Sequence, residues 1–124
     1  MLVDTDVLID YLRGVPEAID FLERAVDAVS ISAVTVAELY QGVREGEERI
    51  KLATTLSALT VLPLTEEIAE KAGLYRREYG SGAGCGLANS MIGATANHHN
   101  LALVTLNKRH FPMVSGISQP YAKG

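Results

Sequence analysis

Short apolar runs that alternate with longer helical segments are the strongest constraint on how this chain can fold. Four runs have the length and composition of buried strands, at residues 1–4, 29–32, 61–64 and 101–106. Segments with helical spacing separate each run from the next. Such alternation favours an α/β fold with a mainly parallel sheet whose two faces are covered by helices. A short strand near residues 116–118 is expected to close the sheet.

Residues that start or stop helices divide the first half of the chain. A short helix is predicted from Thr5 to a stop at Gly14, and a second helix begins at Pro16, because proline suits a first helical turn. Helical spacing continues over residues 35–43 and again over residues 47–59. The third strand contains a proline at its end, which predicts either a strand terminus or an edge position.

The second half contains a capped helix and a helix of small residues. Thr65, followed by two glutamates, predicts the N-terminus of a helix over residues 65–79. The glycine-rich stretch at residues 80–86 lacks the spacing of a dinucleotide fingerprint and has no P-loop Gly-Lys-Ser/Thr, so it is interpreted as a flexible connector. A helix of small residues is predicted within residues 86–100, with His98 and His99 near its C-terminal end.

Composition narrows the class of protein. The 124 residues are expected to form a single domain over residues 1–124, with 48% apolar and 21% charged residues. A single cysteine, Cys85, excludes an intrachain disulfide and a multi-cysteine zinc site. No apolar run is long enough to span a bilayer and the chain opens with acids rather than a signal sequence, so we expect a cytoplasmic protein without a membrane partner. The net charge of −4 still permits a nuclease, because acids that hold metal ions would make one acidic.

Two acidic residues follow the first predicted strand. Asp4 ends the strand, which is where parallel α/β folds place their functional sites. Asp6 lies in the first turn of the following helix, and we interpret it as a helix cap. Helix capping is also the alternative for Asp4.

Glu38 is open to two interpretations. Thr35 and Glu38 have the spacing of a capping box, which requires no chemistry. The apolar stripe of this helix contains Val36 and Leu39, however, and Glu38 points away from it, toward solvent or a groove.

Polar residues also follow the fourth predicted strand. The hydroxyl and amide oxygens of Thr105 and Asn107 could hold water on a metal ion, and Lys108 and Arg109 could bind phosphate. The alternative is an ordinary turn with a solvated basic pair. Asn89, near the start of the small-residue helix, is either a site residue or an N-cap.

Four segments in the same order resemble the PIN domain, and in particular the ribonuclease toxins of VapBC toxin–antitoxin pairs. They are VDTDVLIDYLRG, TVAELYQGV, LANSMIGATA and LVTLNKRHF. The resemblance implies a three-layer α/β fold, with a central, mainly parallel sheet of about five strands flanked by helices. It also implies a Mg²⁺- or Mn²⁺-dependent endoribonuclease of a type II toxin–antitoxin system, a VapB-like antitoxin partner whose basic side chain reaches the acids, and a homodimer.

The resemblance also implies a site. Asp4 and Glu38 match the first two family acids, and Asn89 falls where the third, an aspartate, is normally found. Asn107 matches a position that is acidic in some members, and Thr105 matches a supporting hydroxyl. Asp4, Glu38 and Asn89 would hold the metal, and Lys108, Arg109 and Arg13 are candidate contacts to RNA phosphates.

Because position 89 is an asparagine, the sequence does not decide whether this chain is an active nuclease. An amide keeps one ligand oxygen but removes a negative charge, so metal affinity and catalysis should fall. The asparagine is either natural or an introduced substitution. One alternative is an inactive PIN-like module that binds RNA or an antitoxin. A second is a phosphatase with an Asp-x-Asp nucleophile, which we disfavour because the segment LVTLNKRH supplies no acidic pair.

Overall fold

The computed structural model describes residues 1–80 and 85–122. Its centre is a sheet of five parallel strands in the order β3-β2-β1-β4-β5. The strands are short: β1 (Leu2–Val3), β2 (Ser30–Ser32), β3 (Thr60–Leu62), β4 (Leu103–Val104) and β5 (Ile117–Ser118). The predicted α/β architecture with a parallel sheet is therefore confirmed, and Pro63 follows the edge strand β3 as expected.

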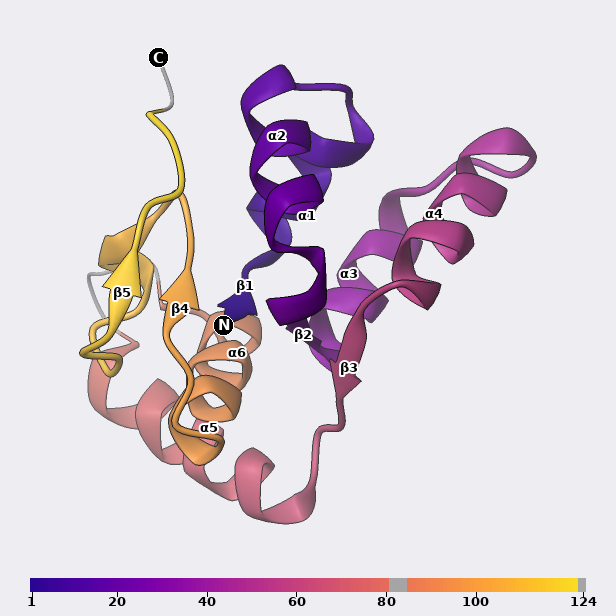
Figure 1. Cartoon of the computed structure of the whole chain (residues 1–124). Coiled ribbons are helices and arrows are strands. Elements are labelled where there is room, and N and C mark those ends of the chain that lie inside the picture. The colour runs from indigo at the N-terminus through magenta and orange to yellow at the C-terminus, as the bar shows by residue number, and fades with distance from the viewer. Residues whose placement is uncertain (81–84, 123–124) are drawn as a thin grey trace.

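Six α-helices flank the sheet in the described part of the chain (Figure 1). They are α1 (Thr5–Leu12), α2 (Pro16–Ala25), α3 (Ala33–Gly42), α4 (Glu47–Ser57), α5 (Glu66–Tyr79) and α6 (Leu87–His98). Two single-turn 3₁₀ helices, η1 (Val26–Ala28) and η2 (Lys108–His110), complete the regular structure. The predicted stops and starts are also found: Gly14, with φ +82°, follows α1, Pro16 begins α2, and the Thr65 hydroxyl accepts a hydrogen bond from Ile68 N–H at 3.2 Å.

The apolar core lies on both faces of the sheet because neighbouring strand residues point to opposite sides. Val3 of β1 packs with residues of α1 to α4 in one cluster, whereas its neighbour Leu2 packs with Ile92 of α6 and Phe111 in another. Helix α5 covers α6 from outside through Ile68 and the small residues of α6. In Figure 1, α1 to α4 accordingly lie on one side and α5 with α6 on the other.

Some expected boundaries differ from the structure. The fourth strand contains only Leu103 and Val104; Thr105 N–H still donates to Ser118 O at 3.1 Å, and the chain bends at Leu106. Residues 81–84 of the predicted glycine-rich connector lie outside the described residues. His98 and His99 occupy the end of α6 as predicted, with their rings in an edge-on contact.

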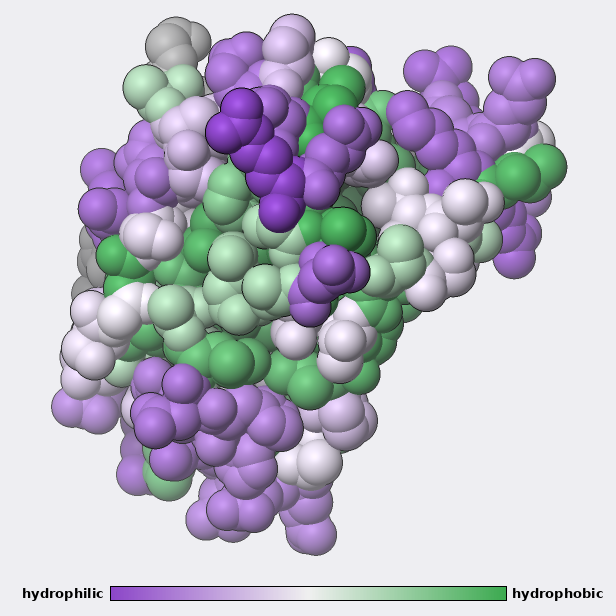
Figure 2. Space-filling view, viewed as in Figure 1, coloured by the Kyte–Doolittle hydropathy of each residue, from purple (hydrophilic) through white to green (hydrophobic). Residues whose placement is uncertain are grey.

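The surface is divided between polar and apolar regions. Figure 2 shows hydrophilic residues over α5 and over the outer end of α4, and a band of more hydrophobic residues across the middle of the molecule. Within residues 1–80 and 85–122, no helix is long and apolar enough to cross a membrane.

Candidate functional site

Asp4 lies at the carboxyl end of the central strand β1, where it is the N-cap of α1. Its Oδ1 accepts a hydrogen bond from Thr5 N–H at 2.8 Å, and its Oδ2 accepts one from the Thr105 hydroxyl at 2.8 Å. Parallel pairing of Val3 with Val104 brings the residues that follow β1 and β4 together. Asp4 is 6% exposed and Thr105 is fully buried, so their hydrogen bond is shielded from water.

Asp6 does not cap the first helix, and that prediction is wrong. Its Oδ2 accepts hydrogen bonds from Leu106 N–H at 3.0 Å and from the Asn107 side-chain amide at 3.1 Å, and it lies 3.3 Å from the Thr105 hydroxyl oxygen. A contact made roughly a hundred positions away leaves no local pattern in the sequence. Asp6 is therefore a member of the site that sequence reasoning missed.

Glu38 reaches the same region from α3. Its Oε1 accepts a hydrogen bond from the Thr5 hydroxyl at 2.7 Å, and the hydroxyl oxygens of Thr5 and Thr35 are 3.0 Å apart. The capping-box interpretation of Glu38 is wrong: the N-cap of α3 is Ser32, whose side chain accepts from Val34 N–H at 3.0 Å. A chain of hydroxyl groups thus connects Glu38 to the end of β1, and Thr5 and Thr35 are further members that the sequence did not reveal.

The carboxylates of Asp4 and Asp6 are costly to ionise. Burial, together with the neighbouring Asp6 charge, raises the pKa of Asp4 from 3.8 to about 7, although hydrogen bonds from Thr105 and Thr5 oppose the rise. Burial also raises the pKa of Asp6, against the hydrogen bonds that it accepts. Among the described residues, no ion pair involves either group. A bound cation would offset the unfavourable charge.

The donor chemistry fits a hard divalent cation. Carboxylate and amide oxygens are the ligands that Mg²⁺ and Mn²⁺ prefer. The Asp6 Oδ1 atom is buried and has no hydrogen-bond partner in the described structure, so at least this acceptor oxygen lacks a protein donor. In the described ranges, however, no group of three or more His, Cys, Asp or Glu side chains is arranged to hold a metal ion. The predicted ligand set contains only two acids, Asp4 and Glu38.

Asn89 is the third residue of α6 and is half-buried. The N-cap of α6 is Gly86, so the alternative that Asn89 caps this helix is wrong. Helix α6 contacts α3, the helix that carries Glu38. Asn89 as a metal ligand stays a prediction.

The predicted phosphate contacts fall into two groups. Lys108 and Arg109 are exposed in η2, directly after Asn107, which is tied to Asp6. Arg13 is exposed on the other side of Glu38, and the two residues line a cavity of about 440 Å³ together with residues of α3 and α4. The structure thus brings Asp4, Thr105 and Asn107 together through hydrogen bonds; Lys108 and Arg109 directly follow Asn107, and Arg13 lies with Glu38 at the cavity.

Comparison with known proteins supports one family. The PIN-domain model matches residues 1–116. The chain is 43% identical to ribonuclease VapC10 of Mycobacterium tuberculosis, over 98% of this chain and 93% of that protein. It is 36% identical to ribonuclease VapC19 of the same species, over 97% and 98% of the two chains. A chain of a solved toxin–antitoxin complex from Klebsiella pneumoniae superposes with a TM-score of 0.82 at 32% identity, covering 97% of each chain.

A full-length match of this kind, on the parallel sheet and helices described above, establishes the family. The chain belongs to the PIN-domain family and is similar to VapC ribonucleases along nearly its whole length.

Proposed function

We propose that this protein is a metal-dependent endoribonuclease and the toxin of a type II toxin–antitoxin pair. The proposal is supported by its likeness to two proteins named as VapC ribonucleases and to a chain of a solved toxin–antitoxin complex. The observation that carries the chemistry is the pair of acids that follows β1, Asp4 and Asp6, in which Asp4 is buried and its pKa is raised to about 7. Buried carboxylates without a basic partner are what a divalent cation would stabilise.

The residues of the site have separate roles in this proposal. Asp4, Glu38 and Asn89 would hold Mg²⁺ or Mn²⁺, which when bound makes water more acidic and neutralises charge on the phosphodiester. Thr105 keeps Asp4 in place through its hydroxyl, and Thr5 does the same for Glu38. Lys108, Arg109 and Arg13 would contact RNA phosphates on either side of the acids, and Asn107 begins the segment that presents the basic pair. RNA as substrate implies that the protein acts in the cytoplasm.

Asn89 should weaken this site. A carboxylate in its place would add a negative charge, and hard cations depend strongly on ligand charge. We therefore expect the chain with Asn89 to bind metal less tightly, and to cleave RNA more slowly, than an Asn89→Asp variant.

A VapB-like antitoxin is the proposed protein partner. In the described structure, no basic side chain forms an ion pair with Asp4 or Glu38. A basic side chain of the antitoxin would form such a pair.

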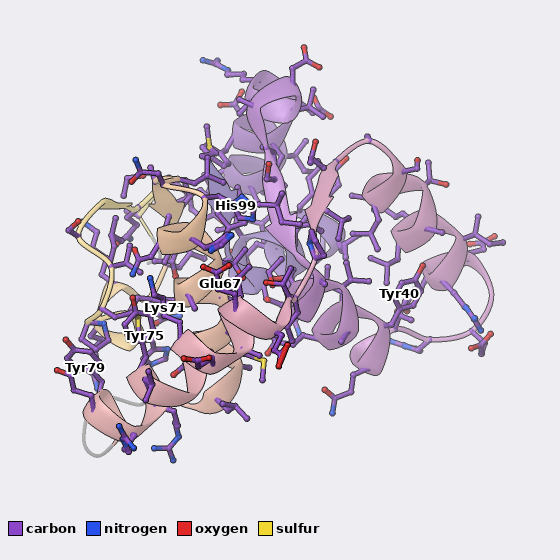
Figure 3. All side chains as sticks on the ribbon, turned by 90° about the horizontal axis from the view of Figure 1, so that it is seen from below. Tyr40, Glu67, Lys71, Tyr75, Tyr79 and His99 are labelled. Atoms are coloured by element: carbon purple, nitrogen blue, oxygen red, sulfur yellow. The ribbon has the colours of Figure 1, made fainter. Side chains whose placement is uncertain are left out.

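A homodimer is also proposed. Figure 3 shows Tyr40 on a different part of the molecule from Tyr75 and Tyr79. The Tyr75 hydroxyl accepts a hydrogen bond from the Asn97 amide at 2.9 Å, whereas Tyr40 is 38% exposed. The surface around Tyr40 is therefore the better candidate for the contact between subunits.

The deciding experiment compares three antitoxin-free proteins: the chain itself, Asn89→Asp, and Asn89→Asp combined with Asp4→Asn. Each is incubated with an RNA mixture in chelator, Mg²⁺ or Mn²⁺, and its melting temperature is measured against metal concentration. We expect cleavage and a metal-induced rise in melting temperature to be strongest for Asn89→Asp and to disappear when Asp4 is also replaced.

The other outcomes separate the alternatives. Cleavage by the unchanged chain at the rate of Asn89→Asp would mean that two acids suffice. Absence of cleavage by all three proteins, with RNA or antitoxin still bound, would favour the inactive binding module. Hydrolysis of p-nitrophenyl phosphate but not RNA would favour the phosphatase.

A further inference from the structure

One oxygen of Asp6 holds the segment that leaves β4. Asp6 Oδ2 accepts from Leu106 N–H at 3.0 Å and from the Asn107 amide at 3.1 Å, and the Thr105 hydroxyl oxygen is 3.3 Å away. Asp6 lies in the first turn of α1, so these contacts join two segments about one hundred residues apart.

Thr105 is fully buried and Leu106 packs against the apolar core, but few other hydrogen bonds hold the segment. The last sheet-type contact of β4 is the hydrogen bond from Thr105 N–H to Ser118 O, at 3.1 Å. After it, the Asn107 N–H donates back to the Thr105 hydroxyl oxygen at 3.0 Å. Leu106 N–H would lack a partner without Asp6, and a partly buried N–H without an acceptor is unfavourable.

Both ends of the segment, Thr105 and Asn107, belong to the proposed active site. Thr105 donates to Asp4 Oδ2 at 2.8 Å, and Asn107 immediately precedes η2, which carries Lys108 and Arg109. Asp6 Oδ2 therefore restrains Leu106 and Asn107, the residues that join the Thr105 hydroxyl to the turn that presents the basic pair.

We infer that Asp6 is a positioning residue, which sets the Thr105–Asn107 segment so that the hydroxyl meets Asp4 and the basic pair meets the RNA backbone. This inference depends on the proposed ribonuclease function for its RNA ligand. In this role Asp6 acts through the atoms that it orients, rather than as a ligand of the metal or of RNA.

An amide substitution separates positioning from metal binding. In Asp6→Asn the side-chain oxygen can still accept from Leu106 N–H and Asn107, whereas the negative charge is lost. Asp6→Ala removes both the acceptor and the charge. Asp20→Ala is the matched control, since Asp20 is an exposed carboxylate on α2 that pairs with Arg24 at 3.0 Å.

The test combines three measurements on these variants of the full chain. Backbone amide exchange at Leu106 reports the segment itself, with Leu103 N–H, which donates to Gly116 O at 2.8 Å, as an internal reference for the intact sheet. Fluorescence anisotropy gives the affinity for a short single-stranded RNA in chelator, and Mn²⁺ titration by electron paramagnetic resonance gives the metal affinity.

We expect Asp6→Ala to lose Leu106 protection while Leu103 stays protected, and to bind RNA about tenfold more weakly, since displacement by about an ångström is costly at a binding site. Asp6→Asn should restore both properties, and Asp20→Ala should change neither. Equal losses of Mn²⁺ affinity in Asp6→Asn and Asp6→Ala, with RNA binding and Leu106 protection unchanged, would overturn the inference and make Asp6 a metal ligand. Unchanged Leu106 protection in Asp6→Ala would also overturn it.

Failure of the proposed ribonuclease function would give a different set of results from failure of the inference about Asp6. If neither the chain nor its Asn89→Asp variant cleaves RNA, the ribonuclease proposal fails, while the exchange and RNA-binding measurements still decide the role of Asp6.

Discussion

The protonation of Asp4 should be visible in the pH dependence of stability. Its pKa is 3.8 when unperturbed and about 7 in the folded protein, because of burial and the neighbouring Asp6 charge. Between these values the folded state binds more protons than the unfolded state, so the free energy of unfolding should fall as pH rises from about 4 to about 7. The stabilisation is fully present below pH 4 and is lost by pH 7.

Urea unfolding in chelator, measured at several pH values for the wild type and Asp4→Asn, checks this prediction. The difference between the two proteins should decrease across this range by a few kcal/mol, since one pKa unit corresponds to about 1.4 kcal/mol. A difference that stays constant from pH 4 to pH 7 would contradict the raised pKa. Metal affinity should increase over the same range, because the ligand must be deprotonated.

Thr105 is a second single residue with a measurable role. Thr105→Val keeps the shape but removes the donor to Asp4 and the acceptor of Asn107 N–H, so the free energy of unfolding should fall by about 1–3 kcal/mol. Thr105→Ser, which retains the hydroxyl, serves as the control. Denaturant unfolding at pH 7 measures both variants, and equal stability of Thr105→Val and wild type would show that the buried hydroxyl contributes nothing.

At the scale of elements, α5 offers a clean test of helix capping. The Thr65 hydroxyl accepts from Ile68 N–H, and α5 then packs on α6, the helix that carries Asn89. Thr65→Ala should lower the free energy of unfolding by about 1 kcal/mol, whereas Thr65→Ser should retain most of this stabilisation. Thermal unfolding of the wild type and the two variants measures these differences. A Thr65→Ser variant as unstable as Thr65→Ala would mean that the hydroxyl group does not stabilise the helix.

At the scale of the whole molecule, Tyr121 ties the C-terminal segment to α1. Its hydroxyl donates to Asp10 Oδ2 at 2.8 Å, across 111 residues of sequence, and Asp10 is 2% exposed. Burial and the adjacent Asp10 raise the pKa of Tyr121, which keeps the hydroxyl protonated as a donor.

Tyr121→Phe should therefore lower the free energy of unfolding by about 1–2 kcal/mol, because a buried carboxylate loses a donor. RNA binding should be unchanged, since Tyr121 is not one of the proposed phosphate contacts. Urea unfolding and the anisotropy assay test the two halves of this prediction. A variant that unfolds normally but loses RNA binding would place the C-terminal segment in the RNA interface instead.

Much of the fold could be predicted from local patterns. Alternating apolar runs located the strands, and Gly14, Pro16 and Thr65 located helix ends, because these signals depend on neighbours within a few residues. Local patterns gave wrong predictions where a polar side chain bonds to a residue far away in the sequence. Thr35 and Glu38 have capping-box spacing, yet Ser32 caps α3, and Thr35 and Glu38 turn to Thr5 instead.

Sequence patterns alone were enough to predict the α/β class, the approximate limits of most elements and, through resemblance, the family and candidate residues Asp4, Glu38, Asn89, Thr105 and Asn107. The contacts that these residues make became clear from the three-dimensional structure. It placed Asp6 on the β4 segment and made Asp4 a buried group with a raised pKa. The physical reason is that strand and helix preferences arise from neighbours along the chain, whereas burial and hydrogen bonding at this site depend on parallel pairing between β1 and β4, about one hundred residues apart.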